Sequence, residues 1–394
     1  MIHGVLISKG GAERTLLTLS HLLREKGHDV SIFVLAYDKF KTFSELTEGL
    51  NIMPIFKVKP KSLRESKSVI AKTLREFGIA YGMIKLSRMN FKSFDMVHAH
   101  NYPANNVAAM IRRRQDVPAI WGCNEPYRCI WKPWQDTKPT FLGRLEDISI
   151  NRPLRRLDVE LATWINKIYV VSEYMKNKVR ALYKRSAQVI HPGVDLNEFN
   201  EKVKRDEIRE KYDLQGKFVI VTAARLHPIK NVAAVIKAVA YATKTISKNK
   251  LIIIGEGPDK NRLIKLVDTY GLKENAIFTG EVSEISKYYA AADVFVFMPY
   301  DEPWGLAPVE AMACGVPVIV SNEGGPSESV IDGITGFHVS SNKPEEIASK
   351  LILLYHNEDK KFEMGKRAAK HAMNYSWDKM LKHVEGLYQS ALLP

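Results

Sequence analysis

The sequence predicts an α/β protein of two domains, and three observations support this. Short apolar runs typical of buried strands alternate with helix-forming segments, which is the order of elements in a parallel α/β fold. The length of 394 residues allows two domains that each bury a core. Charge also divides the chain, because residues 1–195 hold 32 Lys and Arg against 18 Asp and Glu, whereas residues 196–394 hold 26 of each kind.

The composition predicts a protein without a membrane span or a disulfide framework. The hydrophobic fraction is 45%, and no apolar run approaches the length of about eighteen residues that a spanning helix needs. The N-terminus lacks the charged-then-apolar layout of a signal peptide. Cys123, Cys129 and Cys314 are an odd number of cysteines, which predicts reduced thiols in a cytoplasmic protein.

The first half carries the whole excess of positive charge. Residues 57–92 contain ten Lys and Arg against only Glu65 and Glu76. This charge predicts attraction to an anionic surface: membrane headgroups, a pyrophosphate-linked lipid or nucleic acid. A helix is expected over residues 62–77, with an apolar and basic stretch over residues 79–89 after it. Such a segment can lie on anionic lipid; the alternative is a solvated helix with an ordinary core stripe.

Two strands of the first half are expected at residues 29–36 and 95–100. His98 and His100 lie on the same side of the second strand, because side chains alternate along a strand with a period of two. A metal site would need a third ligand, which the sequence does not indicate. We therefore expect a structural or polar-lining role for both histidines.

Residues 118–128 predict a strand that ends in a loop, and aromatic residues gather there. They are Trp121, Tyr127, Trp131 and Trp134. Aromatic faces stack well on sugars and acyl chains, so one interpretation is an acceptor region. The other is a packed aromatic core, which the same residues would equally form.

Two strands of the second half end in loops that carry candidate ligand contacts. Residues 218–231 predict a strand and then a loop with Arg225 and Lys230, two cations that in isolation would be read as solvated. Residues 250–258 predict a buried strand that ends in a helix-start loop with Gly255 and Gly257.

The stretch from residue 301 to 320 predicts a ligand crevice. A buried strand precedes it, Pro308 suits the first turn of a helix, and Gly315 suits the left-handed position that ends one. The next strand begins at Val318. In such a strand–loop–helix–strand unit, the loop at the carboxyl end of the first strand binds ligands.

Two glutamates flank this loop, with Glu302 in the loop and Glu310 in the expected first helical turn. The free N–H groups from Gly305 to Val309 would form an anion site at the helix start. A carboxylate on each side of an anion site suits a phosphorylated ligand with hydroxyls at both ends, such as a nucleotide sugar. The alternative is that Glu310 only complements the helix dipole and Glu302 is a solvated loop residue.

The whole string resembles the Glu-x7-Glu motif of the retaining GT-B glycosyltransferases of family 4. The resemblance continues in Gly-Leu-Ala-Pro-Val-Glu-Ala-Met-Ala-Cys-Gly-Val-Pro-Val-Ile from Gly305, in residues 323–328 and 332–336, and in an Arg-x4-Lys pair formed by Arg225 and Lys230. With the Pro-Gly-Val-Asp string at residues 192–195, it covers nearly the whole chain.

The resemblance implies a GT-B architecture of two Rossmann-like domains that face each other across a cleft. It implies an acceptor-side domain over residues 1–195, a nucleotide-sugar domain over residues 196–375, and a helix over residues 376–394 that crosses back to the first domain. It also implies that the first strand is shortened, with residues 1–3 as its remnant or residues 5–8 as a shorter strand.

The resemblance also implies roles for single residues in the transfer of a hexose with retention of configuration. Arg225 and Lys230 would stabilise the leaving diphosphate, Glu302 would hold the donor sugar and phosphate, and Glu310 would hold the ribose hydroxyls. The other expected donor-binding residues are Gly11, Asn124, Gly255, Gly257, Gly305, Leu306 and Ala307. Many relatives carry a histidine near this position that touches the donor sugar, whereas this chain has Asn124 and Glu125. No histidine-based role is therefore expected there. The nucleotide sugar is a substrate, and no cofactor or metal is expected.

The acceptor implied by the resemblance is a lipid-linked or cell-surface glycan, and residues 324–328 favour mannosyl transfer. We expect a cytoplasmic protein that contacts an anionic membrane surface at its inner face through the basic first domain, without nucleic acid. Two alternatives stay open: a non-hydrolysing sugar-nucleotide epimerase on the same fold, and a non-enzymatic basic protein that binds membrane or nucleic acid. For the latter no helix-turn-helix or RNA-reading signature is present.

Overall fold

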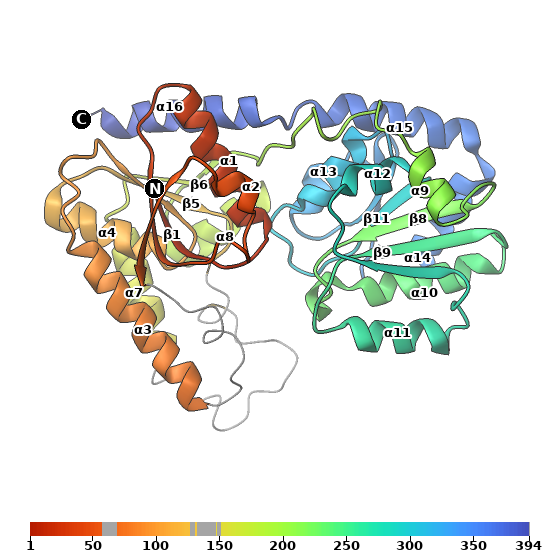
Figure 1. The fold of residues 1–394 in the computed structure, drawn as a ribbon, viewed down its shortest axis with the longest axis horizontal. Helices are drawn as coiled ribbons and strands as arrows, with labels where there is room; N and C mark the ends of the chain where they lie inside the picture. The colour runs from red at the N-terminus through yellow and green to blue at the C-terminus, as the bar shows by residue number, and fades with distance from the viewer. Residues whose placement is uncertain (57–68, 127–130, 132–146, 148–150, 394) are drawn as a thin grey trace. The chain divides into compact units, whose positions relative to one another are not determined.

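The structure is a computed structural model that describes residues 1–56, 69–126, 131, 147 and 151–393, without the side chains of residues 69–77. The chain divides into two compact units, each built on a parallel sheet. Unit 1 comprises Met1–His191 with Met380–Pro394, and unit 2 comprises Pro192–Lys379. Both are α/β units, as the alternation of strands and helices predicted (Figure 1).

Unit 1 contains a seven-stranded sheet in the order β3-β2-β1-β4-β5-β6-β7. Its strands are β1 (Ile2–Leu6), β2 (Ser31–Tyr37), β3 (Asn51–Phe56), β4 (Val97–His100), β5 (Ala119–Cys123), β6 (Lys167–Val170) and β7 (Gln188–Val189). Its helices are α1 (Gly11–Glu25), α2 (Ser44–Thr47), α3 (Val69–Ser87), α4 (Ala104–Gln115), α7 (Arg152–Ala162), α8 (Glu173–Tyr183) and most of α16 (Trp377–Leu392). The strand order reverses between β1 and β4, where parallel sheets of this kind bind ligands.

The expected shortening of the first strand is wrong. β1 runs from Ile2 to Leu6, and it pairs with β2 along its length and with β4 at its start. Ile2 and Leu6 are fully buried. His3 and Gly4 hid the strand in the sequence because neither is a typical strand residue, yet His3 is buried and its Nδ1 lies 3.2 Å from the carbonyl oxygen of His100.

The basic helix continues beyond residue 77, where it was expected to end. In the described part of the chain α3 spans Val69–Ser87, and residues 62–68 lie outside the described residues. The helix continues through the apolar and basic stretch because its glycines do not end it. Gly82 faces Phe56 and Leu35 so closely that a Cβ would lie 2.6 Å from the Phe56 ring. A small residue here lets the helix approach the sheet.

Unit 2 contains a six-stranded sheet in the order β10-β9-β8-β11-β12-β13. Its strands are β8 (Phe218–Ala223), β9 (Asn249–Ile254), β10 (Ala276–Gly280), β11 (Val294–Phe297), β12 (Val318–Ser321) and β13 (Gly336–Val339). Its helices are α9 (Asp206–Lys211), α10 (Val232–Thr243), α11 (Lys260–Thr269), α12 (Ile285–Ala290), α13 (Leu306–Ala313), α14 (Pro344–His356) and α15 (Glu358–Ala372), with the 3-10 turns η2 (Pro228–Lys230) and η3 (Gly325–Glu328).

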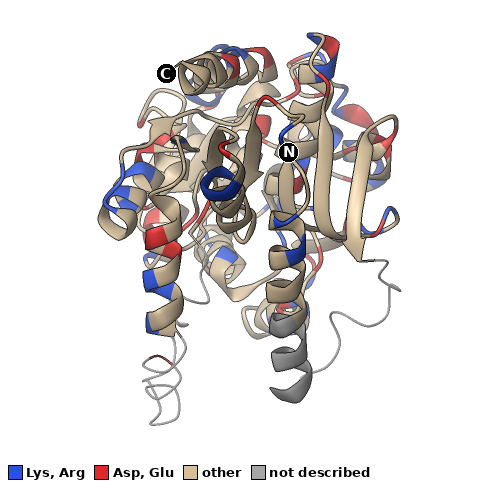
Figure 2. Cartoon of the chain, turned by 90° about the vertical axis from the view of Figure 1, so that its left-hand side faces the viewer, with Lys and Arg blue, Asp and Glu red and all other residues tan. Residues whose placement is uncertain are grey.

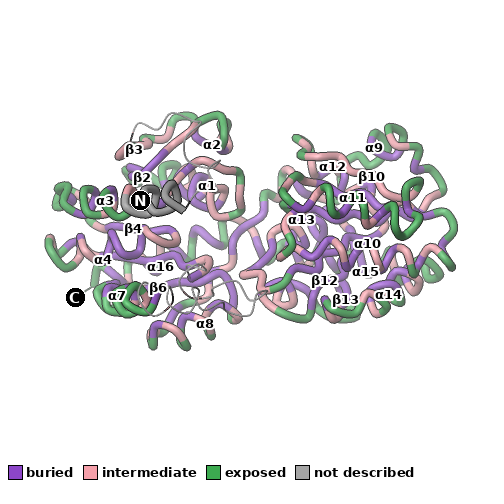
Figure 3. Tube along the Cα trace, turned by 90° about the horizontal axis from the view of Figure 1, so that it is seen from below, coloured by how far each residue is buried: buried purple, intermediate pink, exposed green. Residues whose placement is uncertain are grey.

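The core of unit 2 lies between its sheet and helices α10 and α14, which pack against each other. Figure 1 shows these two helices on one face of the sheet and α12 and α13 on the other. All six residues of β8 are buried. Figure 3 shows buried residues at the centre of each unit. Burial on both faces is the usual condition of a parallel sheet and explains the unbroken apolar runs of the sequence.

Two of the buried histidines of unit 1 stack on the same face of β4. The ring centroids of His98 and His100 lie 4.1 Å apart, as the two-residue period of the strand predicted. The Nδ1 and Nε2 atoms of His98 lie 2.7 Å from the Tyr388 hydroxyl and 3.2 Å from the Tyr169 hydroxyl. His98 therefore connects β4 to β6 and to α16, a structural role.

Burial favours the neutral form of these histidines, and acid should consequently destabilise unit 1. Burial lowers the pKa of His98 to about 3, whereas in the unfolded chain it has the ordinary value near 6.5. Below pH 6.5 the unfolded state binds a proton that the native state does not, so stability is full above pH 6.5 and falls as the pH drops towards 3. For His98 alone the expected loss at pH 5 is about 2 kcal/mol.

Hydrogen exchange of peptides from β4 and β5 at pH 5 and pH 8, corrected for the intrinsic pH dependence of exchange, would measure this loss. His98→Gln should show an acid dependence that is smaller by about 2 kcal/mol. The exposed His356→Gln of unit 2 is the matched control and should behave as the wild type. An unchanged acid dependence in His98→Gln would contradict the prediction.

Candidate functional site

Most of the candidate donor-site residues gather in unit 2, at the carboxyl ends of β8, β9 and β11. β8 and β11 are neighbours, and the strand order reverses between them. The Nζ atom of Lys230, from the loop after β8, lies 2.5 Å from Oε2 of Glu302, from the loop after β11. Both side chains are largely buried, with 25% and 16% of their surface exposed. The two charged residues predicted from separate loops therefore form an ion pair.

Two backbone hydrogen bonds, to the end of β9 and to the loop after it, fix the position of Arg225. The Ala224 N–H donates to the Ile254 carbonyl at 3.1 Å, and the Leu226 N–H donates to the Glu256 carbonyl at 2.9 Å. Arg225 lies between these bonds with an exposed side chain. Its backbone is thus held as firmly as a strand residue, while its guanidinium faces solvent.

Gly255 and Gly257 permit this backbone contact. A Cβ on Gly255 would lie 2.1 Å from the carbonyl oxygen of Ala224, and a Cβ on Gly257 would lie 2.2 Å from that of Leu226. Gly255 also has a φ of +124°, which side chains rarely adopt. Both predicted glycines therefore lie against the loop that carries Arg225.

The loop of Lys230 is fixed at both ends. It forms the turn η2, and Asn231 follows in the left-handed conformation with its side-chain amide donating to the Ser341 carbonyl at 3.0 Å. The Tyr300 N–H donates to the Ile229 carbonyl at 2.8 Å, which joins the loop after β8 to the loop after β11. This bond brings Lys230 and Glu302 together.

The glycine pair Gly324 and Gly325, which was not predicted to belong to the site, contacts the loop of Glu302. The Gly325 N–H donates to the Glu302 carbonyl at 2.9 Å. A Cβ on Gly325 would lie 2.0 Å from the Pro303 carbonyl oxygen, and Gly324 has a φ of +82°. The adjacent glycines themselves were the available signal of a close backbone approach.

Helix α13 starts at Leu306, directly after Gly305, which takes a φ of +87°. Glu310 therefore lies in the second turn and not the first. Pro308 is still within the first turn, where a missing N–H costs no helical bond. Gly315 ends the helix with a φ of +77°, which confirms the predicted left-handed position.

The start of α13 leaves three backbone donors for a ligand. The N–H groups of Gly305, Leu306 and Ala307 precede the first N–H that donates within the helix, and no residue in the described part of the chain accepts from them. They carry the positive end of the helix dipole. This site is narrower than the predicted span from Gly305 to Val309, because Pro308 has no N–H and the helix itself takes up the later groups.

Glu310 is buried, with 7% of its surface exposed. The hydroxyl of Tyr289 donates to its Oε2 at 3.3 Å. A buried carboxylate is costly unless hydrogen bonds stabilise it. Glu310 was expected in the first turn of the helix, whether as a ligand contact or as a complement to the helix dipole, and the structure places it buried in the second turn.

Two of the predicted donor-site residues belong to unit 1. Gly11 is the first residue of α1, which follows β1. Asn124 follows β5, and its backbone N–H donates to Oδ1 of Asn101 at 3.0 Å. Asn101 is itself in a left-handed conformation, with a φ of 60°. Both predicted residues therefore follow the carboxyl end of a strand, Gly11 at the start of a helix and Asn124 in a loop.

The described aromatic residues of unit 1 form packed contacts. Trp121 is fully buried, and its ring lies edge-on to Tyr183 with the centroids 5.1 Å apart. Nε1 of Trp131 donates to Oδ2 of Asp158 at 3.0 Å. The packed-core interpretation is confirmed for Trp121, while Tyr127 and Trp134 lie outside the described residues. The buried Asp158, which also accepts from Tyr183 at 2.6 Å, was not anticipated.

Helices α3, α4 and α7 of unit 1 carry many Lys and Arg, and we call their exposed surface the basic face. Helix α4 packs against the other two. Figure 2 shows Lys and Arg along the helices of this unit. Exposed apolar side chains lie among the charges: Tyr81, Ile84, Met89, Leu154, Leu157 and Trp164. Among the described residues, no helix combines the length and the apolar character that a bilayer-spanning segment requires.

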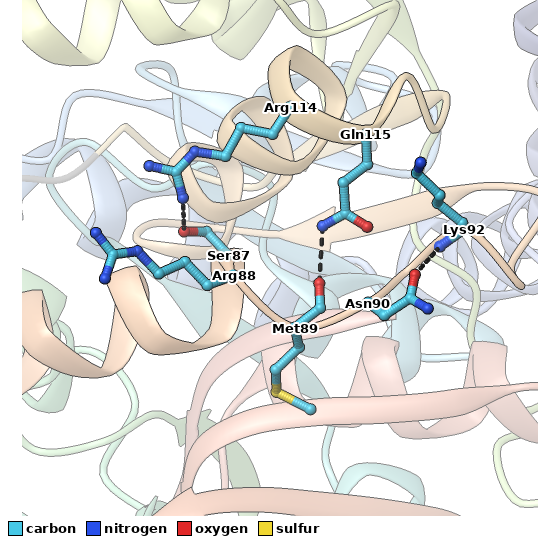
Figure 4. Close-up of a pocket in the computed structure, with 7 residues that line it drawn as sticks. All are labelled: Ser87, Arg88, Met89, Asn90, Lys92, Arg114 and Gln115. Carbon is cyan, nitrogen blue, oxygen red and sulfur yellow. Dashed lines mark hydrogen bonds between the residues drawn. The ribbon is translucent and has the colours of Figure 1, made fainter.

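A cavity of about 430 Å³ opens on this face, where α3 and α4 end (Figure 4). It is lined by Ser87, Arg88, Met89, Asn90, Lys92, Arg114 and Gln115. Nη1 of Arg114 donates to the Ser87 hydroxyl at 3.3 Å, and Gln115 Nε2 donates to the Met89 carbonyl at 2.7 Å. No acidic side chain lines the cavity.

Both halves of the chain match models of known protein families. Residues 9–198 match the model of Glycosyltransferase Family 4, and residues 204–371 match that of Glycosyl transferases group 1. D-inositol 3-phosphate glycosyltransferase 1 of Catenulispora acidiphila is 23% identical over 398 residues, which cover 97% of this chain and 91% of that protein. A GDP-mannose-dependent alpha-(1-6)-phosphatidylinositol monomannoside mannosyltransferase of Mycolicibacterium smegmatis is 32% identical over 211 residues, 50% of this chain and 53% of its own.

The fold is also similar to solved structures. Anabaena Alr3699/HepE in complex with UDP superposes with a TM-score of 0.79 at 19% identity, over 99% of each chain. This similarity confirms the predicted fold class, GT-B.

The close contact at Gly325 leads to a stability prediction for unit 2. Gly325→Ala would press a methyl group onto the Pro303 carbonyl, so the loop of Glu302 must move. We expect a loss of about 1–3 kcal/mol in the free energy of unfolding. Urea unfolding, together with hydrogen exchange of the peptide that contains residues 300–305, would measure it.

Gly386→Ala is the matched control, because a Cβ at Gly386 in α16 meets no atom within 4 Å. It should leave stability unchanged or raise it by up to about 1 kcal/mol through its helix propensity. Equal stability and equal exchange in Gly325→Ala and the wild type would show that the loop does not depend on this contact.

Proposed function

Because the chain belongs to glycosyltransferase family 4 and is a glycosyltransferase, we propose that it transfers a hexose from a nucleotide sugar to an acceptor hydroxyl with retention of configuration. Unit 2 would bind the donor. The observation that carries this proposal is the ion pair of Lys230 and Glu302, which lies beside the exposed Arg225 and the start of α13.

The charges of this site suit a leaving nucleoside diphosphate. The diphosphate gains negative charge as the bond to the sugar breaks, and fixed cations placed near it lower the barrier. Arg225 can bond phosphate oxygens in a bidentate manner, and Lys230 acts as a point charge. The N–H groups of Gly305, Leu306 and Ala307 add a helix N-terminus, which favours a phosphate.

Glu302 and Glu310 would recognise hydroxyl groups on opposite sides of the phosphates. A carboxylate accepts hydrogen bonds from hydroxyls but repels phosphate, so each acid suits a sugar. Glu302 would bind the hexose, with Lys230 balancing its charge. Glu310, buried in the second turn of α13, would hold the ribose hydroxyls.

A same-face mechanism agrees with these residues. Glu302 is paired with Lys230 at 2.5 Å and is therefore a weakened nucleophile. In the proposed step the acceptor oxygen bonds to the anomeric carbon on the face from which the diphosphate leaves. The bond between that carbon and the phosphate oxygen breaks, and the acceptor proton passes to the donor phosphate.

The acceptor we propose is a lipid-linked or cell-surface glycan, with mannose as the transferred hexose. The GDP-mannose-dependent phosphatidylinositol monomannoside mannosyltransferase among the relatives supports this choice. The basic face of unit 1 would bring the enzyme to the inner face of an anionic membrane.

A thermal-shift panel with UDP, GDP, ADP and their common sugars tests the donor site. We expect one nucleotide family to stabilise the wild type, and Arg225→Ala to reduce its affinity at least tenfold, because a charge-assisted contact to the diphosphate is lost. Lys217→Ala is the control, since Lys217 precedes β8 and so lies at the amino end of that strand, opposite the end that carries Arg225. Binding of no nucleotide, or equal binding by Arg225→Ala, would reject the site.

Vesicle sedimentation tests the membrane contact. Reversal of two cavity charges, Arg88→Glu with Arg114→Glu, should weaken binding to anionic vesicles more than tenfold, since each basic residue near such a surface contributes about 1 kcal/mol. Lys244→Glu with Lys248→Glu, both exposed on unit 2, changes the net charge equally and should bind as the wild type. Wild-type binding to neutral vesicles that equals binding to anionic ones would rule out the basic face as the cause.

A further inference from the structure

Tyr289 contacts Glu310, the residue proposed to hold the ribose hydroxyls of the donor. Its side chain is fully buried, and its hydroxyl donates to Oε2 of Glu310 at 3.3 Å. Tyr289 is on α12 and Glu310 is on α13, two helices that pack against each other. The motif of the family string includes Glu310 but ends far from Tyr289, so the sequence alone did not indicate this residue.

Two aromatic rings pack near the ring of Tyr289. The ring of Phe295 of β11 is edge-on to it with the centroids 5.2 Å apart, and the centroid of the Phe199 ring lies 6.1 Å away. A second contact joins the two helices one turn away, where the thiol of Cys314 lies 3.9 Å from the Ser286 carbonyl. The hydroxyl of Tyr289 is thus presented to Glu310 from a rigid position, which a flexible donor could not provide.

We propose that Tyr289 is a positioning residue: it orients the Glu310 carboxylate towards the ribose of the donor nucleotide and so sets the preference for ribonucleotides over 2′-deoxyribonucleotides. The inference rests on the proposed ribose contact of Glu310. A glutamate side chain has three rotatable bonds, and without a fixed partner its carboxylate would sample several orientations. A hydrogen bond from a locked tyrosine selects one of them before the nucleotide arrives, which lowers the entropic cost of binding.

The consequence is specific to the ribose hydroxyls. Loss of the Tyr289 hydroxyl should weaken the contact of Glu310 with the ribose, while the diphosphate contacts of Arg225 and Lys230 remain. Affinity for a ribonucleotide should therefore fall, whereas affinity for the corresponding 2′-deoxyribonucleotide should change little. A purely structural tyrosine would affect both nucleotides alike.

Isothermal titration calorimetry on the full-length protein tests this with GDP and 2′-deoxy-GDP, and in parallel with the UDP and ADP pairs. In the wild type we expect the ribonucleotide of the bound family to be preferred about tenfold or more. In Tyr289→Phe the preference should fall by about five- to tenfold, which is the typical net contribution of one protein hydrogen bond. Glu310→Gln should lower the preference at least as far.

Tyr288→Phe is the matched control. Tyr288 is the preceding residue of the same helix and is also buried, but its hydroxyl lies 3.3 Å from that of Tyr212 and not from a carboxylate. It should keep the wild-type preference, and melting temperatures would show that all three variants are folded.

Three outcomes would overturn the inference. A full ribonucleotide preference in Tyr289→Phe, or an equal loss of affinity for both nucleotides, would show that Tyr289 does not act through the ribose. A wild type that binds a ribonucleotide and its 2′-deoxy form equally would remove the ribose contact of Glu310 and this inference with it. If no nucleoside diphosphate bound, the donor proposal itself would fail, which is a distinguishable result.

Discussion

The donor side of this protein depends on direct contact between backbones at three glycines. Gly255, Gly257 and Gly325 each face a carbonyl oxygen from a neighbouring loop, at distances that no side chain could share. These contacts hold the loops after β8 and β11 in place without using any of the charged side chains. The side chains of Arg225, Lys230 and Glu302 take no part in these backbone contacts, and Lys230 and Glu302 pair with each other.

The fold could be predicted from the sequence because parallel sheets are buried on both faces. Runs such as that of β8 are apolar at every position and are hard to read as anything else. The errors fell where one residue type fits two roles. Gly78 and Gly82 resemble the end of a helix but lie within α3, and His3 and Gly4 conceal a central strand. Gly82 packs against Phe56 and His3 contacts His100, and such neighbours cannot be identified from the local sequence.

The candidate site shows the same limit. The family string indicated Glu302, Glu310, Arg225 and Lys230, and the structure brings Lys230 and Glu302 into contact. Glu310 was expected one turn too early, because Pro308 is acceptable at several positions of a first turn and does not fix where the helix begins. Tyr289 could not be found at all, because its relation to Glu310 exists only across two packed helices.

Unit 1 is built from segments at opposite ends of the chain, since Met380–Pro394 belong to it together with Met1–His191. During synthesis, β4 and β6 leave the ribosome long before α16 does. Until α16 arrives, His98 lacks the Tyr388 hydroxyl, and the surface that will cover Leu381, Val384 and Leu387 stays open to water. Unit 2 is contiguous in the sequence, so all of its residues are translated before the segment Met380–Pro394 that completes unit 1.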